Sequence, residues 1–374
     1  MNLADLSRLL LLIALGVGVA TGCQTLGASQ ESEPAPQAER VPPAPAAAEV
    51  AGGEPAEPGM LPSSPLPRGA AIKLPSVQVE VTDLQRADSA LRMLRAASPT
   101  NRPPPQGSEY VLVHLSLTGL APPKSWVGCK DFRVIGADRI AYFHSSQIPP
   151  APELKAGLLK EEERTEGWCV YSVHANERSL ILMVSISDAR FPRERRYLAL
   201  EPGAALAPAP IAAAPASPQS AGESPLSAAA PGQEVLTQDW SVTVVEIRRG
   251  DAARRLVENA NSRNPAPADG REFVAVKLRA RYRGRTEHPA LLSRAAFRTI
   301  NSDGKPYENP IVFDVAPRLN RMLLPGGEHT GWAVFQVAPG DTRAVLRFQP
   351  LYPDRDRRYF ALVESARFDE LRSE

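Results

Sequence analysis

The sequence predicts an all-β protein built from two tandem β-sandwich domains, and three observations lead to this prediction. A pattern of almost forty positions that begins near residue 77 recurs 163 positions later without a gap. Within each copy, short runs of apolar residues alternate with polar ones, which is typical of half-buried strands. Two tracts rich in Pro and Ala flank the first copy. A chain that repeats a domain-sized pattern contains two copies of one fold.

The two copies align position by position over their first part. At the constant offset the aligned pairs include Gly107 and Gly270, Glu109 and Glu272, Arg86 and Arg249, Asp88 and Asp251, and Tyr110 and Phe273. Farther along the chain the offset changes by one or two positions. There Gly167-Trp168 aligns with Gly331-Trp332, and Arg196-Tyr197 aligns with Arg358-Tyr359.

Residues 1–22 are expected to be a signal peptide, because Arg8 precedes an apolar run that is short for a membrane span. The run ends in Ala20-Thr-Gly-Cys23, which resembles the lipobox of bacterial lipoproteins. The resemblance implies that Cys23 becomes the first mature residue and carries acyl chains, and Gln24 after it favours the outer membrane. An uncleaved anchor and an ordinary signal peptide are the alternatives.

Two segments lack the apolar content that a folded core needs. Residues 23–75 form the lipidated Cys and a Pro-, Ala- and Glu-rich tether, and residues 202–233 form a Pro- and Ala-rich linker. Such segments are expected to be disordered. The two repeats are therefore assigned to residues 76–201 and 234–366, and residues 367–374 are left as a C-terminal tail.

Each repeat is expected to contain about seven short strands. Six of them in repeat one fall near 77–81, 109–118, 131–136, 168–174, 179–187 and 195–200, and six in repeat two near 240–244, 272–283, 296–301, 331–337, 342–348 and 357–363. Between the first two strands of each repeat, Asp88 and Asp251 precede apolar residues spaced three and four apart, which predicts a short helix with the Asp as N-cap. Trp168 and Trp332 are expected to pack in the cores.

The second repeat also resembles a known family. Gly270-Arg-Glu-Phe-Val precedes a strand, Asp303-Gly-Lys-Pro-Tyr307 follows Phe297 in a hairpin, and Leu324-Pro-Gly-Gly-Glu328 leads into Gly331-Trp332. This order resembles the DUF4352, telokin-like family of immunoglobulin-like domains, which occur in exported bacterial lipoproteins. Repeat one is similar more loosely, with Leu158-Leu-Lys-Glu-Glu-Glu163 in place of the Leu-Pro-Gly-Gly-Glu element. The resemblance implies an immunoglobulin-like fold and carries no catalytic residues.

Two cysteines remain after Cys23, namely Cys129 and Cys169 in repeat one. In an oxidising compartment they are expected to form a disulfide, and two buried free thiols are the alternative. The five histidines show no metal-ligand spacing, and no phosphate-binding loop or nucleophile motif occurs. Glu109 and Glu272 are expected to pair with Arg86 and Arg249 rather than act as catalytic carboxylates. We therefore expect no catalytic, cofactor or metal site.

One row of residues stands out in repeat two. Five cations recur at every second position: Lys277, Arg279, Arg281, Arg283 and Arg285. A strand directs alternate side chains to one face, so all five are expected on one face, with Val276, Leu278, Ala280 and Tyr282 on the other. The row is either a solvated face interspersed with acidic residues or a docking surface for an anionic ligand. Repeat one has His114, Ser116 and Thr118 at the aligned positions.

The sequence therefore predicts a non-enzymatic, lipid-anchored envelope protein, periplasmic or surface-exposed. Its partners are expected to be the membrane, through the lipid, and a protein or an anionic glycan or lipid that binds the modules. A structural or scaffold subunit of an envelope assembly or stress-protection complex is the alternative. The net charge of +1 gives no reason to expect nucleic acid as a partner.

Overall fold

The computed structural model describes residues 57–120, 126–186, 194–209, 221–285, 287–313, 315–350 and 357–363. The signal peptide, Cys23, residues 24–56 of the tether, the middle of the linker and the C-terminal tail lie outside these residues. No helix in the described part of the chain is both long and apolar enough to cross a membrane.

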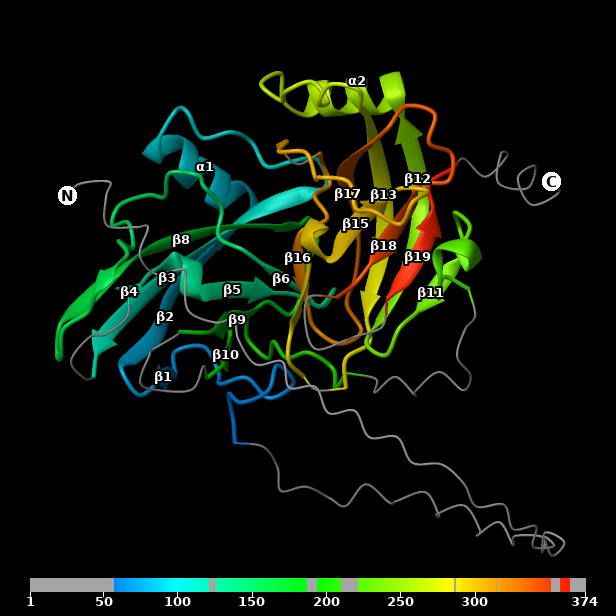
Figure 1. Ribbon diagram of the computed structural model, residues 1–374. Coiled ribbons are helices and arrows are strands. Elements are labelled where there is room, and N and C mark those ends of the chain that lie inside the picture. Colours follow the sequence, from blue (N-terminus) through cyan, green and yellow to red (C-terminus); the bar gives the residue numbers. More distant parts are fainter. Residues whose placement is uncertain are drawn as a thin grey trace, which may run out of the picture. The chain divides into compact units, whose positions relative to one another are not determined.

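Repeat one is a β-sandwich of two antiparallel sheets (Figure 1). One sheet has the order β1-β2-β3-β8, and the other begins with β10-β9-β5-β6. The strands are β1 (Ala71–Lys73), β2 (Val77–Arg86), β3 (Ser108–Gly119), β5 (Phe132–Ile135), β6 (Ile140–Tyr142), β8 (Arg164–His174), β9 (Ile181–Val184) and β10 (Arg196–Ala199). A separate ribbon pairs β4 (Trp126–Val127) with β7 (Gly157–Leu158).

Repeat two has the same plan. Its first sheet has the order β11-β12-β13-β17 and its second the order β15-β18-β19. The strands are β11 (Glu234–Leu236), β12 (Trp240–Arg249), β13 (Glu272–Tyr282), β15 (Phe297–Ile300), β17 (Glu328–Val337), β18 (Val345–Phe348) and β19 (Arg358–Ala361). A ribbon of β14 (Ala290–Leu292) and β16 (Arg321–Leu323) corresponds to the β4–β7 ribbon of repeat one. The all-β fold class expected from the sequence is confirmed.

The duplication extends to irregular details. β2 and β12 each contain a bulge, after Val81 and after Val244, and these two positions are related by the offset of the repeat. Gly167 and Gly331 lie against the backbone of a crossing segment, where a Cβ atom would come within 2.2 Å and 2.6 Å of neighbouring atoms. Only glycine fits such an approach, which explains why both repeats keep the Gly-Trp pair.

One helix follows the first long strand in each repeat: α1 (Ala87–Ala97) and α2 (Gly250–Ala260). The N-cap positions are Arg86 and Arg249 and make no side-chain cap bond, so the expectation that Asp88 and Asp251 are the caps is wrong. The strand runs directly into the helix, which places each Asp inside the first turn. There its charge is favourable to the helix dipole.

The helices cover the outer face of one sheet in each repeat. α1 packs Ala90 and Leu94 on Tyr110 and Trp168, and α2 packs Ala253 and Val257 on a cluster that contains Trp332. Both tryptophans are buried, as expected, but they lie beneath a helix rather than between the sheets.

The ordered region is larger than the sequence predicts. β1 and Leu66, which bridges to Leu198, lie within the segment expected to be a disordered tether. Ala204 and Leu206 are buried, and Ala229 bridges to Phe360, within the segment expected to be a linker. These short apolar stretches gain order because the sheet edges supply hydrogen-bonding partners that composition does not reveal.

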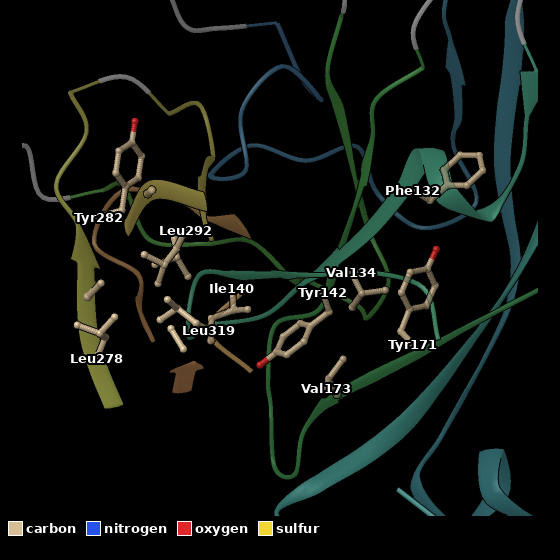
Figure 2. Packing of buried hydrophobic residues seen from close by; sticks show 14 of the residues in the cluster. Phe132, Val134, Ile140, Tyr142, Tyr171, Val173, Leu278, Tyr282, Leu292 and Leu319 are labelled. Carbon is tan, nitrogen blue, oxygen red and sulfur yellow. The ribbon is translucent and has the colours of Figure 1, made fainter. Parts of the chain in front are cut away.

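The two repeats are joined by backbone pairing. β16 of repeat two pairs with β6 of repeat one, which extends that sheet to the order β10-β9-β5-β6-β16-β14. The register places Met322 opposite Ala141 and Leu323 opposite Ile140, and the Leu324 amide donates to the Arg139 carbonyl. Buried apolar residues continue across this seam, where Ile140, Leu292 and Leu319 lie between the two sandwiches (Figure 2).

We predict that Ala141→Pro separates the unfolding of the two repeats. Strand alternation directs the Ala141 amide toward β16, and proline lacks this donor. The loss leaves a buried acceptor unpaired, at a cost of about 1–3 kcal/mol. Calorimetry should then show two unfolding transitions in place of one. Ala141→Gly keeps the amide and is the control, and a single transition in the proline variant would contradict the prediction.

Candidate functional site

The basic row begins where the helix α2 ceases to cover the sheet. Along β13 the outward side chains of Phe273 and Ala275 pack in the cluster with the helix, and Lys277, Arg279 and Arg281 follow on the same face. The intervening residues Val276, Leu278, Ala280 and Tyr282 face the core, as the sequence predicts. Arg279 and Arg281 are exposed, and Lys277 is half-buried.

The row is shorter than the sequence predicts. β13 ends at Tyr282, so Arg283 and Arg285 do not continue its alternation. The amide of Arg283 donates to the Asp239 carbonyl at 2.7 Å, and its side chain is half-buried. Periodicity alone gives no signal for this turn, because the basic residues continue through it. The surface on the strand therefore consists of Lys277, Arg279 and Arg281, here called the basic row.

Both hydroxyl and acidic side chains flank the basic row, and at its inner end Lys277 lies opposite Glu246 on β12. Arg279 lies opposite Thr243 on β12 and Thr330 on β17. Within the described residues, no carboxylate lies within 4.0 Å of a charged group of the basic row. At its inner end, the Lys277 ammonium lies 5.7 Å from the centre of the Trp332 ring. Arg279 and Arg281 are therefore open to solvent, whereas Lys277 is partly covered.

Ser241 and Glu328 flank the remaining arginine, Arg281. Of the two, Ser241 already donates to Glu234 on β11. Acidic groups thus lie around the margin of this face, and its middle is the cross-strand row Thr243, Arg279 and Thr330.

The equivalent surface of repeat one carries acidic residues on both sides of its central position, and Arg164 on β8 donates to Ser116 there. There Ser116 lies between Glu80 on β2 and Glu166 on β8, where repeat two has Arg279 between two threonines. Since both sheets fold in the same register, neither set of charges is required for folding. The basic row is a property of repeat two alone.

The shared Arg–Glu pairs are structural, as the sequence predicts. Arg249 contacts Glu272 at 2.7 Å and also donates to the Asp341 and Leu362 carbonyls. Arg86 contacts Glu109 and, in addition, Glu201. Each pair ties the strand-to-helix junction to the opposite sheet.

The disulfide between Cys129 and Cys169 is confirmed. Its sulfur atoms are 2.01 Å apart and its Cα atoms 5.5 Å apart. It joins the short turn before β5 to the middle of β8, and thereby links the two sheets of repeat one. Closing a loop of this length stabilises the fold by roughly 3–4 kcal/mol in the chain-entropy model.

Sequence reasoning missed a charged cluster at the seam between the repeats. The β5–β6 turn supplies Asp138, and the end of β8 and the turn after it supply His174 and Glu177. One ligand atom from each lies within 4.8 Å of the others. His174 Nδ1 is 3.0 Å from Asp138 Oδ2, which also accepts from the Tyr142 hydroxyl. Asp138 lies far from His174 and Glu177 in the chain, so the three residues form no motif, and only the adjacent turns bring them together.

Burial and hydrogen bonding shift the pKa values of the three residues in this cluster in different directions. Burial, then the hydrogen bond and charge of Asp138, raise the pKa of Glu177 to about 7. Burial alone would raise the pKa of Asp138 too, but hydrogen bonds from His174, Glu177 and Tyr142 lower it below its ordinary value. The hydrogen bond to Asp138 raises the pKa of His174. The pKa of Asp138 is thus lowered while those of its neighbours Glu177 and His174 are raised.

Two basic side chains of repeat two complete the seam. Burial lowers the pKa of Arg321, whereas the negative charge of Asp138 raises it in part. Burial also lowers the pKa of His329 to about 4, and His329 Nε2 lies 2.7 Å from the Arg318 carbonyl. The imidazole and carboxylates of the cluster are also ligand types for a divalent cation, but their mutual hydrogen bonds already account for all three groups.

The sequence matches no protein-family model and none of the curated proteins, so the resemblance to DUF4352 is not confirmed. Among solved structures, the chain is similar to ycdA of Bacillus subtilis, a candidate lipoprotein, with 11% identity over 34% of this chain and 37% of that one, at a TM-score of 0.28. The match thus spans little more than a third of that protein.

Two further matches span nearly the whole length of the other chain. The secreted protein MPT63 of Mycobacterium tuberculosis has 14% identity over 37% of this chain and 98% of that chain, with a TM-score of 0.26. A β-sandwich protein of Clostridium difficile has 9% identity over 40% of this chain and 100% of that one, with a TM-score of 0.24. Similarity at this level carries no inference about function, so the surface is interpreted from its own geometry.

We predict that Glu177→Gln stabilises the protein at high pH more than at low pH. The pKa of Glu177 is 4.5 in an ordinary setting and about 7 in the fold, so the folded state binds more protons between these values. The free energy of unfolding of the native protein therefore falls as the pH rises through this window, and glutamine removes that loss. Urea unfolding from pH 5 to pH 8 measures the difference, with the exposed Glu166→Gln as control. A difference that does not change with pH would refute the prediction.

Proposed function

We propose that this protein is a non-catalytic, lipid-anchored component of the cell envelope that presents two immunoglobulin-like modules to a protein or anionic envelope ligand. The observation that supports the proposal most directly is the basic row. Two exposed arginines and a half-buried lysine lie on one face of the central strand without an ion-pair partner among the described residues. Such a surface attracts phosphate or carboxylate groups and speeds their encounter.

The covalent features of the chain agree with an exported location. The disulfide forms in oxidising compartments such as the periplasm. The apolar segment before Cys23 and the small residues around it resemble a lipoprotein signal. Two or more acyl chains on Cys23 would anchor the protein stably, whereas one chain would not.

We predict that Cys23→Ser abolishes lipid attachment. In cells that grow with labelled palmitate, the native chain should incorporate the label and the variant should not, because serine provides no thiol for acylation. Cys129→Ser with Cys169→Ser should leave the labelling unchanged. Label on the Cys23→Ser protein would contradict the proposed anchor.

We predict that Arg279→Glu with Arg281→Glu weakens retention on an anionic matrix roughly tenfold at about 0.05 M salt, because the surface charge is reversed where screening is weak. Thermal stability should change little, since both side chains are exposed. The control, Arg255→Glu with Lys305→Glu, makes the same change in charge at exposed positions elsewhere in repeat two. Equal salt-dependent retention of both double variants would dispose of the basic row as a docking surface.

The joined sheet also suits a second role, as a structural subunit of an envelope assembly. Pairing of β6 with β16 fixes the spacing of the two modules, which a rigid scaffold requires. Native cross-linking separates the two roles. A stable stoichiometric complex supports the scaffold, and transient complexes that the Glu variants lose support ligand capture.

A further inference from the structure

Two arginines lie directly opposite each other on the other sheet of repeat two. Arg298 on β15 pairs with Arg347 on β18, and Arg347 pairs in turn with Tyr359 on β19. Their neighbours Phe297, Leu346 and Phe348 face the core, so the two guanidinium groups share the outer face of the sheet. Like charges in a directly opposed cross-strand pair destabilise a sheet unless an anion offsets them.

The described residues supply no such anion. None of their carboxylates lies within 4.0 Å of either guanidinium. Arg347 Nε is moreover buried and has no hydrogen-bond acceptor. A buried N–H without an acceptor carries a desolvation cost of about 1–3 kcal/mol, and more when the group is charged. Among the described residues, Arg347 Nε therefore has no acceptor.

A small cavity lies at the same place. It has a volume of about 230 Å³ and is lined by Ala295, Ala296, Arg298, Arg347, Gln349 and Pro350. Sites for drug-sized ligands are larger, from about 300 Å³ upwards, so this cavity suits a small ion or a single functional group. The planar guanidinium groups can each donate two parallel hydrogen bonds to an oxyanion, and the Gln349 amide can donate another.

Repeat one shows that the fold does not require the pair of arginines. Its equivalent row is Arg133, Met183 and Tyr197, in the same register. Arg133 donates to the Phe132 carbonyl at 2.7 Å and lies 4.3 Å from the centre of the Phe143 ring. A single arginine with its own partners thus fills this place in repeat one, and the second arginine is particular to repeat two.

We propose that Arg298 and Arg347 form a binding site for a tetrahedral oxyanion, either free phosphate or the phosphate group of a larger phosphomonoester. The anion supplies the missing acceptor of Arg347 and offsets the repulsion between the two cations. This site is separate from the basic row, which lies on the other sheet of the sandwich. Either site can therefore exist without the other.

The test is calorimetric titration of the full chain with inorganic phosphate at constant ionic strength. Arg347→Met recreates the row of repeat one and should weaken phosphate binding at least tenfold, the equivalent of about 1.4 kcal/mol. Arg343→Met removes the same charge at an exposed position in the same repeat and should bind phosphate as the native protein does. Arg298→Met, which empties the other side of the cavity, should weaken binding as Arg347→Met does. Thermal unfolding verifies that each variant is folded.

A second titration with glycerol phosphate distinguishes the two sources of the anion. Binding of phosphate alone identifies a free ion as the ligand, and equal or tighter binding of glycerol phosphate identifies a phosphate group on a larger molecule. Binding of neither probe to the native protein would overturn the proposal, as would undiminished binding to folded Arg347→Met. Retention on the anionic matrix should be unaffected by Arg347→Met, so failure of this site and failure of the basic row give different results.

Discussion

Pairing between β6 and β16 is the constraint on which the arrangement of this protein depends. A sheet edge carries unpaired amides and carbonyls, and burying them without partners is costly. In repeat one the edge at Ile140–Tyr142 is satisfied by a strand of repeat two, so the two sandwiches share one sheet and their apolar residues form a continuous cluster. The same contact positions Arg321 and His329 beside the charged cluster around Asp138. The geometry of the seam and its electrostatics thus have one origin.

The equivalent edge of repeat two is closed in a different way. Tyr307 occupies the place of Tyr142, and its amide donates to the Thr299 carbonyl on β15. The residue before it is Pro306, where repeat one has Ala141, and Lys305 precedes that. Proline has no amide to offer a further strand, and a lysine at an exposed edge opposes pairing. Pro306 therefore disfavours a further strand at this edge of repeat two, whereas Ala141 offers an amide to β16 in repeat one.

Duplication gave the protein two copies of a scaffold whose surfaces then diverged. Equivalent positions carry Glu–Ser–Glu in one repeat and Thr–Arg–Thr in the other, on sheets of the same register. On the other sheet, the cross-strand row Arg133–Met183–Tyr197 of repeat one corresponds to Arg298–Arg347–Tyr359 of repeat two. Since each repeat shows what the fold tolerates without the other's residues, packing does not require these differences.

The sequence by itself determined the elements that local periodicity encodes: the alternating strands, the duplicated Arg–Glu pairs, the even pair of cysteines and the cations on β13. Tertiary structure alone decided the rest. Strand alternation could not reveal that β13 ends at Tyr282, because Arg283 and Arg285 continue the pattern through a turn. Composition could not reveal that β1 completes a sheet edge. Asp138, His174 and Glu177 meet only because two turns lie side by side, and Arg298 and Arg347 only because two strands pair. Contacts between distant segments depend on the register of strands in space, which no window of sequence contains.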